Sequence, residues 1–142
     1  MKVMAQLAFN GVCRQAFQHY AEVLGGKIVV MNTFGGNDAR LPPGSVASAP
    51  EHIRFARLEV AEGAILGNDV PPHQHEPMQG FNLALHLESV DEAERIFSAL
   101  GEGGDISTPL AEVPWAKRFG MLRDHFGVPW LVLALDGGNA SR

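Results

Sequence analysis

The stretch EVPWAKRFGMLRDHFGVPWLVLAL, residues Glu112–Leu135, decides how the rest of the chain is interpreted. It contains both tryptophans, Trp115 and Trp130, and it ends in an apolar run without a charge, Trp130–Leu135. A strand with one face on solvent alternates apolar and polar residues, whereas a strand covered on both faces does not. We therefore predict a final strand at Val128–Leu135 that is buried on both faces.

Length and composition favour a single globular domain. The chain has 142 residues, 46% of them hydrophobic, and a formal net charge of −5. A core of its own is expected at this size. No basic cluster is present, so we expect no nucleic-acid partner. No apolar run reaches the about 20 residues that a transmembrane helix needs, so we expect no membrane contact. The lone cysteine, Cys13, and the absence of a signal-peptide pattern at Met1-Lys2-Val3 favour a cytoplasmic protein.

The predicted elements occur twice in the same order. Hydrophobic periodicity and turn residues separate strands from helices. The first series is strand Val3–Asn10, helix Val12–Leu24, strand Lys27–Phe34 and the hairpin Arg54–Ala61 with Ala64–Gly67. The second series is strand Gly80–Glu88, helix Val90–Leu100 and strands Asp105–Val113, Arg118–Arg123 and Val128–Leu135.

Two segments interrupt this order. Gly35–Glu51 is rich in Gly, Pro, Ser and Ala, and we predict a long loop that acts as a mobile lid. Asn68–Gln79 is proline-rich and is predicted to be a linker rather than an element.

Self-comparison supports an internal repeat. An offset of 77 residues pairs Ala16 with Ala93, and after the long loop an offset of 64 pairs Phe55 with Phe119. The matches keep the order of the elements. We predict an α+β domain spanning residues 1–142, built from two βαβββ modules at 1–70 and 79–136 with the proline-rich linker between them.

Four stretches carry a resemblance to a known family. They are FNGVCRQAFQHYAEVLGGKI, ARLEVAEGAILGND, DEAERIFSALGEGG and PWAKRFGMLRDHFGVPWLV. They resemble the PhnB-like branch of the vicinal-oxygen-chelate superfamily, which includes glyoxalases, extradiol dioxygenases and bleomycin resistance proteins. The chain departs from the branch pattern at Gln15, Phe55 and Pro114. The resemblance implies the glyoxalase/bleomycin resistance fold, in which two modules form a curved mixed sheet around one cavity and the helices pack outside.

The same resemblance implies where a metal would be held. In this superfamily the ligands are His or Gln on the first strand of each module and Glu on the last strand. Here the last strands read AILG and WLVLAL, with Leu131 at about the position of the Glu. Gln6, Asn82 and His86 are neutral remnants that leave a divalent cation uncompensated. We expect no metal centre and no cofactor.

Two further signals are weaker. His73 and His75 could bind a metal adventitiously, but an exposed linker is the preferred interpretation because no third ligand is fixed nearby. Proteins of this branch are often labelled demethylubiquinone methyltransferases, and that activity needs a cofactor loop such as a glycine-rich strand-to-helix turn. Asn10-Gly11-Val12 is too short for one, so we do not expect methyl transfer.

These observations favour a small-molecule-binding protein with an apolar cavity, for a ligand that the sequence does not identify. The alternative is an enzyme of the same superfamily, an isomerase, lyase or dioxygenase, with an unrecognised site. By the resemblance, the modules are expected to form a homodimer. For Trp115 the alternative to ligand contact is core packing. The candidate ligand-binding residues are Gln6, Phe55, Asn82, Trp115, Phe119 and Leu131.

Overall fold

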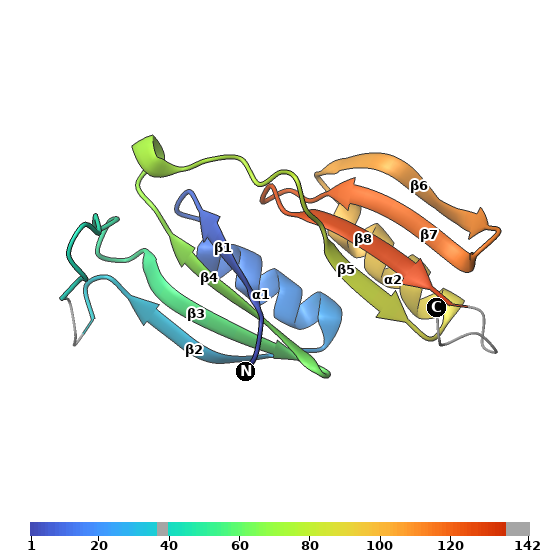
Figure 1. Ribbon diagram of the computed structural model, residues 1–142, viewed down its shortest axis with the longest axis horizontal. Helices are drawn as coiled ribbons and strands as arrows, with labels where there is room; N and C mark the ends of the chain where they lie inside the picture. Colours follow the sequence, from blue (N-terminus) through green and yellow to red (C-terminus); the bar gives the residue numbers. More distant parts are fainter. Residues whose placement is uncertain (37–39, 136–142) are drawn as a thin grey trace. The chain divides into compact units, whose positions relative to one another are not determined.

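A computed structural model describes residues 1–36 and 40–135 (Figure 1). The chain divides into two compact units, Met1–Glu76 and Pro77–Arg142. The first contains β1 (Ala5–Phe9), α1 (Cys13–Leu24), β2 (Lys27–Thr33), β3 (Ile53–Val60), β4 (Gly63–Asp69) and a short 3₁₀ turn η1 (Pro72–Gln74). The second contains β5 (Leu83–Leu87), α2 (Val90–Gly101), β6 (Asp105–Val113), β7 (Ala116–Arg123) and β8 (Pro129–Ala134). The predicted α+β class and the repeated βαβββ order are confirmed.

Each unit has one four-stranded mixed sheet with one helix against it (Figure 1). The strand orders are β1-β4-β3-β2 and β5-β8-β7-β6. In each sheet the first strand is parallel to the last, because the helix carries the chain back across the sheet, and the other pairings are antiparallel. The last strand of each unit is therefore an interior strand.

The position of β8 explains its lack of polar residues. It lies between β5 and β7, and Trp130, Val132 and Ala134 on its helix-facing side are 0% exposed. On its other side Leu133 is 8% exposed and Leu131 is half-buried. The predicted final strand is confirmed at Pro129–Ala134 and is buried on its helix side, whereas its other side is only partly buried.

In the first unit, α1 packs its apolar face on the sheet. Phe17 and Tyr20 are fully buried, and burying side chains of this size stabilises the fold by roughly 1.5–3 kcal/mol each. The ring of Phe17 lies directly over Gly67 of β4, where a Cβ would come within 2.6 Å of it. The helix ends at Gly25, whose φ of 69° is the left-handed conformation that glycine adopts without strain.

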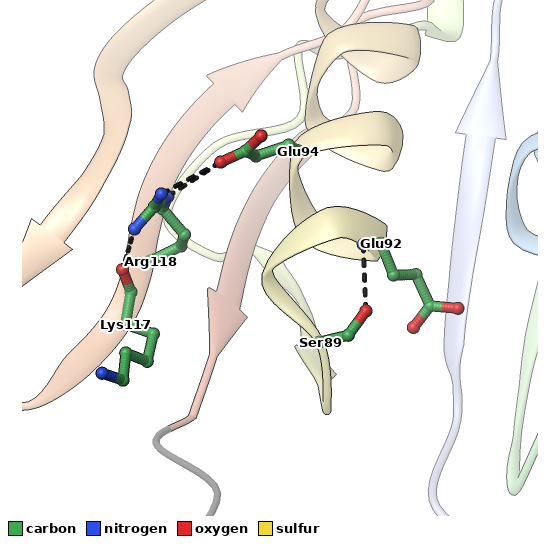
Figure 2. Close-up of polar contacts among 5 residues, drawn as sticks. All are labelled: Ser89, Glu92, Glu94, Lys117 and Arg118. Carbon is green, nitrogen blue, oxygen red and sulfur yellow. Dashed lines mark hydrogen bonds and ion pairs between the residues drawn. The ribbon is translucent and has the colours of Figure 1, made fainter.

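In the second unit, α2 begins at the predicted cap. Oγ of Ser89 accepts a hydrogen bond of 3.0 Å from the backbone N–H of Glu92, as Figure 2 shows. Phe97 of α2 packs against Gly120 of β7. An ion pair of 3.0 Å between Arg118 of β7 and Glu94 adds a second connection from the helix to the sheet (Figure 2).

Two segments differ from their prediction. The strand expected at Gly80–Glu88 covers only Leu83–Leu87, because Gly80 adopts a positive φ and breaks the extended backbone. Asn68–Gln79 is not a plain linker: β4 continues to Asp69 and η1 follows. Asp69 is part of the core because its carboxylate accepts two backbone hydrogen bonds.

The long loop lies partly outside the described residues. Residues 37–39 belong to that part, and residues 40–51 contain neither helix nor strand. The lid stays a prediction. In the part of the chain that the structure describes, no helix is long and apolar enough to cross a membrane.

Candidate functional site

Each sheet has a face that its own helix does not cover, which we call the open face. Paired residues in neighbouring strands point to the same side of a sheet, so the register assigns side chains to this face. In the first unit Gln6, Leu66 and Arg57 form one row across β1, β4 and β3. In the second unit the matching row across β5, β8 and β7 is Ala84, Leu131 and Met121.

Two of the six candidate residues lie in the first unit. Nε2 of Gln6 donates a hydrogen bond of 3.0 Å to Oδ1 of Asn68 on β4. Asn68 and Phe55 line the same pocket at the loop end of the sheet. The sequence analysis did not single out Asn68, although it connects the two residues that were chosen.

The other four candidates lie in the second unit. Trp115, in the turn between β6 and β7, packs edge to face on Phe119 with ring centroids 5.7 Å apart. Trp115 is 52% exposed, so core packing, the alternative for this residue, is wrong. Leu131 lies beside Met121, and Asn82 precedes β5 and lines a pocket that also contains Met121.

The pocket in the first unit, which we call the Arg54 pocket, has a volume of about 480 Å³. Two charged residues, Arg54 and Asp69, are among its lining residues. Most of the remaining wall is apolar. Its lining residues are Phe34, Leu41, Pro42, Ser45, Val46, Arg54, Phe55, Asn68, Asp69, Val70 and Gln74.

The pocket in the second unit has a volume of about 440 Å³. It lies over the Asn82 end of β5 and includes Ile106, Met121 and Arg123. Nη1 of Arg123 donates to the carbonyl oxygens of Met78 and Gly127, so this guanidinium is held by the backbone. The pocket therefore has an apolar surface, and the guanidinium of Arg123 beside it already donates to backbone carbonyl oxygens.

Two buried carboxylates have structural hydrogen-bond partners. Asp69 is 1% exposed, and its two oxygens accept from the backbone N–H of Cys13 at 3.0 Å and of Ile53 at 2.8 Å. Asp124 is 5% exposed and accepts from the indole of Trp130. Backbone amides and indoles stabilise the charged form of a carboxylate without giving it a proton to transfer.

Burial raises the pKa of the Cys13 thiol, and the charge of Asp69 raises it further, while Arg14 lowers it. A nucleophilic cysteine needs the opposite shift, since the thiolate is the reactive form. The Cys13 thiol therefore belongs to the hydrophobic core and is not a candidate nucleophile.

The residues in the open-face rows lie where the superfamily would hold its metal ion, and their donor atoms decide whether such an ion fits. Gln6 offers one amide oxygen, whereas Leu66, Ala84 and Leu131, at the neighbouring positions on first and last strands, have no donor atom. Asn82 lies before β5, and His86 is opposite Leu133. In each unit the first strand offers one such donor side chain on the open face, Gln6 or His86, and the paired last-strand residues, Leu66 and Leu133, offer none. This set does not fit a divalent cation, which takes several anionic or strongly basic donors. Within residues 1–36 and 40–135, no group of three His, Cys, Asp or Glu could hold a metal ion.

Comparison with known proteins gives a consistent family. Residues 1–133 match the family model described as 3-demethylubiquinone-9 3-methyltransferase. The structure of protein PA1353 from Pseudomonas aeruginosa is similar with 37% sequence identity and a TM-score of 0.84, covering 95% of this chain and 98% of that one. The PhnB protein from Bacillus cereus is similar in fold, with 22% identity, a TM-score of 0.79 and coverage of 94% and 99%.

A more distant structure identifies the fold. A glyoxylase/bleomycin resistance protein/dioxygenase domain from Frankia sp. EAN1pec has 17% identity and a TM-score of 0.63, with 96% of this chain and 98% of that chain covered. The fold class inferred from the sequence motifs is therefore confirmed.

Proposed function

We propose, since this chain belongs to the 3-demethylubiquinone-9 3-methyltransferase family in the PhnB-like branch of the vicinal-oxygen-chelate superfamily, that it binds a small organic molecule without a superfamily-type metal centre. The observation that carries the proposal is the pair of rows on the open faces. Leu66 and Leu131 occupy the last-strand positions beside the first strands. Hydrocarbon at these positions favours contact with an apolar ligand over coordination of a cation.

The proposed binding residues are those that combine apolar surface with a few polar groups. In the first unit these are Gln6 and Phe55, which Asn68 connects. In the second unit the aromatic pair of Trp115 and Phe119 supplies a flat apolar surface. Asn82 and Leu131 complete the proposed set.

The name of the family describes methyl transfer, and the strand-to-helix turn of this chain argues against that activity here. A Cβ at Gly11 would lie 3.0 Å from Cε1 of His52, so a side chain of the protein already occupies that side of the turn. The backbone N–H of Cys13, at the start of α1, donates to Asp69. One of the backbone donors with which such a turn would bind a cofactor is thus used within the protein.

We also propose a homodimer that acts in the cytoplasm. The outer strands of the two described sheets have one unpaired edge each, and Ile106 and Trp115 are both 52% exposed. Apolar surface and free edges of this kind are commonly covered by a second copy.

The proposal is tested by ligand-observed NMR with a panel of neutral aromatic and aliphatic fragments. We expect binding at high micromolar affinity that is weakened by Phe55→Ala or Phe119→Ala, since these changes remove apolar contact area. Glu22→Gln, on the exposed side of α1, is the matched control. Absence of any binding would contradict the proposal, and turnover of a fragment would favour the enzyme interpretation instead.

A further inference from the structure

The Arg54 pocket contains a charged group that lacks a full set of partners. Arg54 lies on β3, and its Nε is buried without a hydrogen-bond partner among residues 1–36 and 40–135. Three other arginines have acceptors within the protein: Arg57 pairs with Glu59 at 3.1 Å, Arg118 pairs with Glu94 at 3.0 Å, and Arg123 donates to two carbonyl oxygens. Arg54 is the exception among these four.

An unpartnered buried guanidinium N–H is unfavourable, because the group has lost its water without gaining an acceptor. Guanidinium nitrogens form a planar fork that matches the two oxygens of a carboxylate. A ligand whose carboxylate binds Arg54 supplies the hydrogen-bond acceptor that the protein itself does not provide.

The surroundings of Arg54 define the rest of the ligand. Phe34, Phe55 and Val70 line the same pocket, and its volume of about 480 Å³ suits a molecule with one ring or a short apolar chain. Asn68 is already engaged, since its Oδ1 accepts from Gln6 and its Nδ2 donates to the carbonyl oxygen of Asp69. Ser45 and Gln74 also line the pocket, but Arg54 is the lining residue with a positive charge and therefore the one that can orient an anionic end.

Asp69 limits the charge that the pocket accepts. Asp69 is one of the pocket residues, but it is 1% exposed and its carboxylate accepts two backbone hydrogen bonds. Arg54 and Asp69 together make the pocket formally neutral, so one further negative charge is tolerated better than two. This favours a monoanion over a phosphate dianion.

We infer that the Arg54 pocket binds a small monocarboxylate with an aromatic or short apolar body, its carboxylate on Arg54 and its body against Phe55. This rests on the proposed small-molecule-binding function and specifies its ligand class. The interaction between the ligand carboxylate and Arg54 provides specificity, and the apolar wall of the pocket provides contact area.

The test uses 4-phenylbutanoate and its neutral isostere 4-phenylbutanamide at pH 7, with dissociation constants from NMR titration of the full chain. We expect the acid to bind about tenfold more tightly than the amide, as a charge-assisted hydrogen bond predicts. Arg54→Met keeps the aliphatic stem and should remove the preference while the amide still binds. Arg57→Met, on the same strand, is the matched control and should leave the preference unchanged.

Each outcome decides between the two proposals. Equal binding of acid and amide to the unaltered protein, or a preference that survives Arg54→Met, overturns the carboxylate site and leaves the small-molecule-binding function standing. Binding of neither compound overturns both. If Arg54→Met does not fold by circular dichroism, Arg54→Lys serves instead, and the site requires it to keep the sign of the preference at lower affinity.

Discussion

Nε1 of Trp130 donates a hydrogen bond of 2.8 Å to Oδ2 of Asp124, and both side chains are buried. Oδ1 of the same carboxylate accepts from the backbone N–H groups of Phe126 and Val128. One carboxylate therefore joins the turn before β8 to the second residue of that strand. The two tryptophans have different surroundings, since Trp130 is part of the core and Trp115 is exposed on Phe119.

Trp130→Phe should destabilise the protein by about 1–3 kcal/mol, because phenylalanine lacks the N–H and leaves a buried carboxylate oxygen short of a donor. Chemical denaturation measures the free energy of unfolding. Trp115→Phe is the control and should change it by less than about 0.5 kcal/mol, because Trp115 is 52% exposed. Equal losses in the two variants would contradict a structural role for the bond to Asp124.

Gly67→Ala should destabilise the first unit by about 1–3 kcal/mol, because the new Cβ would lie 2.6 Å from the ring of Phe17. Phe17→Leu in the same chain should recover part of the loss, since it removes the clashing ring. Gly63→Ala, with its nearest neighbour at 3.8 Å, is the control and should have little effect. Thermal unfolding of the three variants gives the comparison, and no recovery in the double variant would count against the contact.

The thiol of Cys13 should react with iodoacetamide only after unfolding, because burial raises its pKa and keeps it protonated. Its contribution to stability is fully present below the ordinary thiol pKa of 9.0. It is lost progressively above that pH, as the unfolded chain ionises and the folded one does not. Mass spectrometry over time measures labelling, with Cys13→Ala as the blank. Rapid labelling of the native protein near pH 7 would contradict this.

Dialysis of the untagged protein against a chelator should leave its unfolding temperature unchanged. In the open-face rows Gln6 has an oxygen that could ligate a metal ion, whereas Leu66, Ala84 and Leu131 have hydrocarbon side chains. Weak uptake of nickel or zinc should disappear in the double variant His73→Ala, His75→Ala. Elemental analysis is the readout. One metal ion per chain that survives the double change would promote the enzyme interpretation.

Light scattering at micromolar concentration should give about twice the chain mass of 15.3 kDa, because free strand edges and exposed apolar side chains favour a second copy. Ile106→Asp tests whether that exposed apolar residue belongs to the interface, and Lys117→Asp is a surface control. A monomer mass for the unaltered protein would exclude the proposed dimer under these conditions.

The sequence by itself determined the order of the elements, the internal repeat and the family. Helix periodicity, the Ser89 cap and the apolar run of β8 depend on residues a few positions apart, and such local patterns are visible along a chain. Of the site, it indicated Phe55 and Phe119 through their place in the repeat and Leu131 through the family pattern. It did not indicate Arg54 or Asn68, because neither residue differs from an ordinary strand residue in its local sequence.

Only the tertiary structure decided which groups have partners. Asp69 binds Cys13 and Ile53, residues far from it in the chain, because β4 lies between β1 and β3. Nε of Arg54 lacks a partner although Nε of Arg57, on the same strand, has one. Pairing across a sheet depends on register between distant segments, and a shift of one residue would turn every side chain to the other face. Local sequence therefore specified the elements, whereas strand register and burial decided which charges the protein satisfies itself.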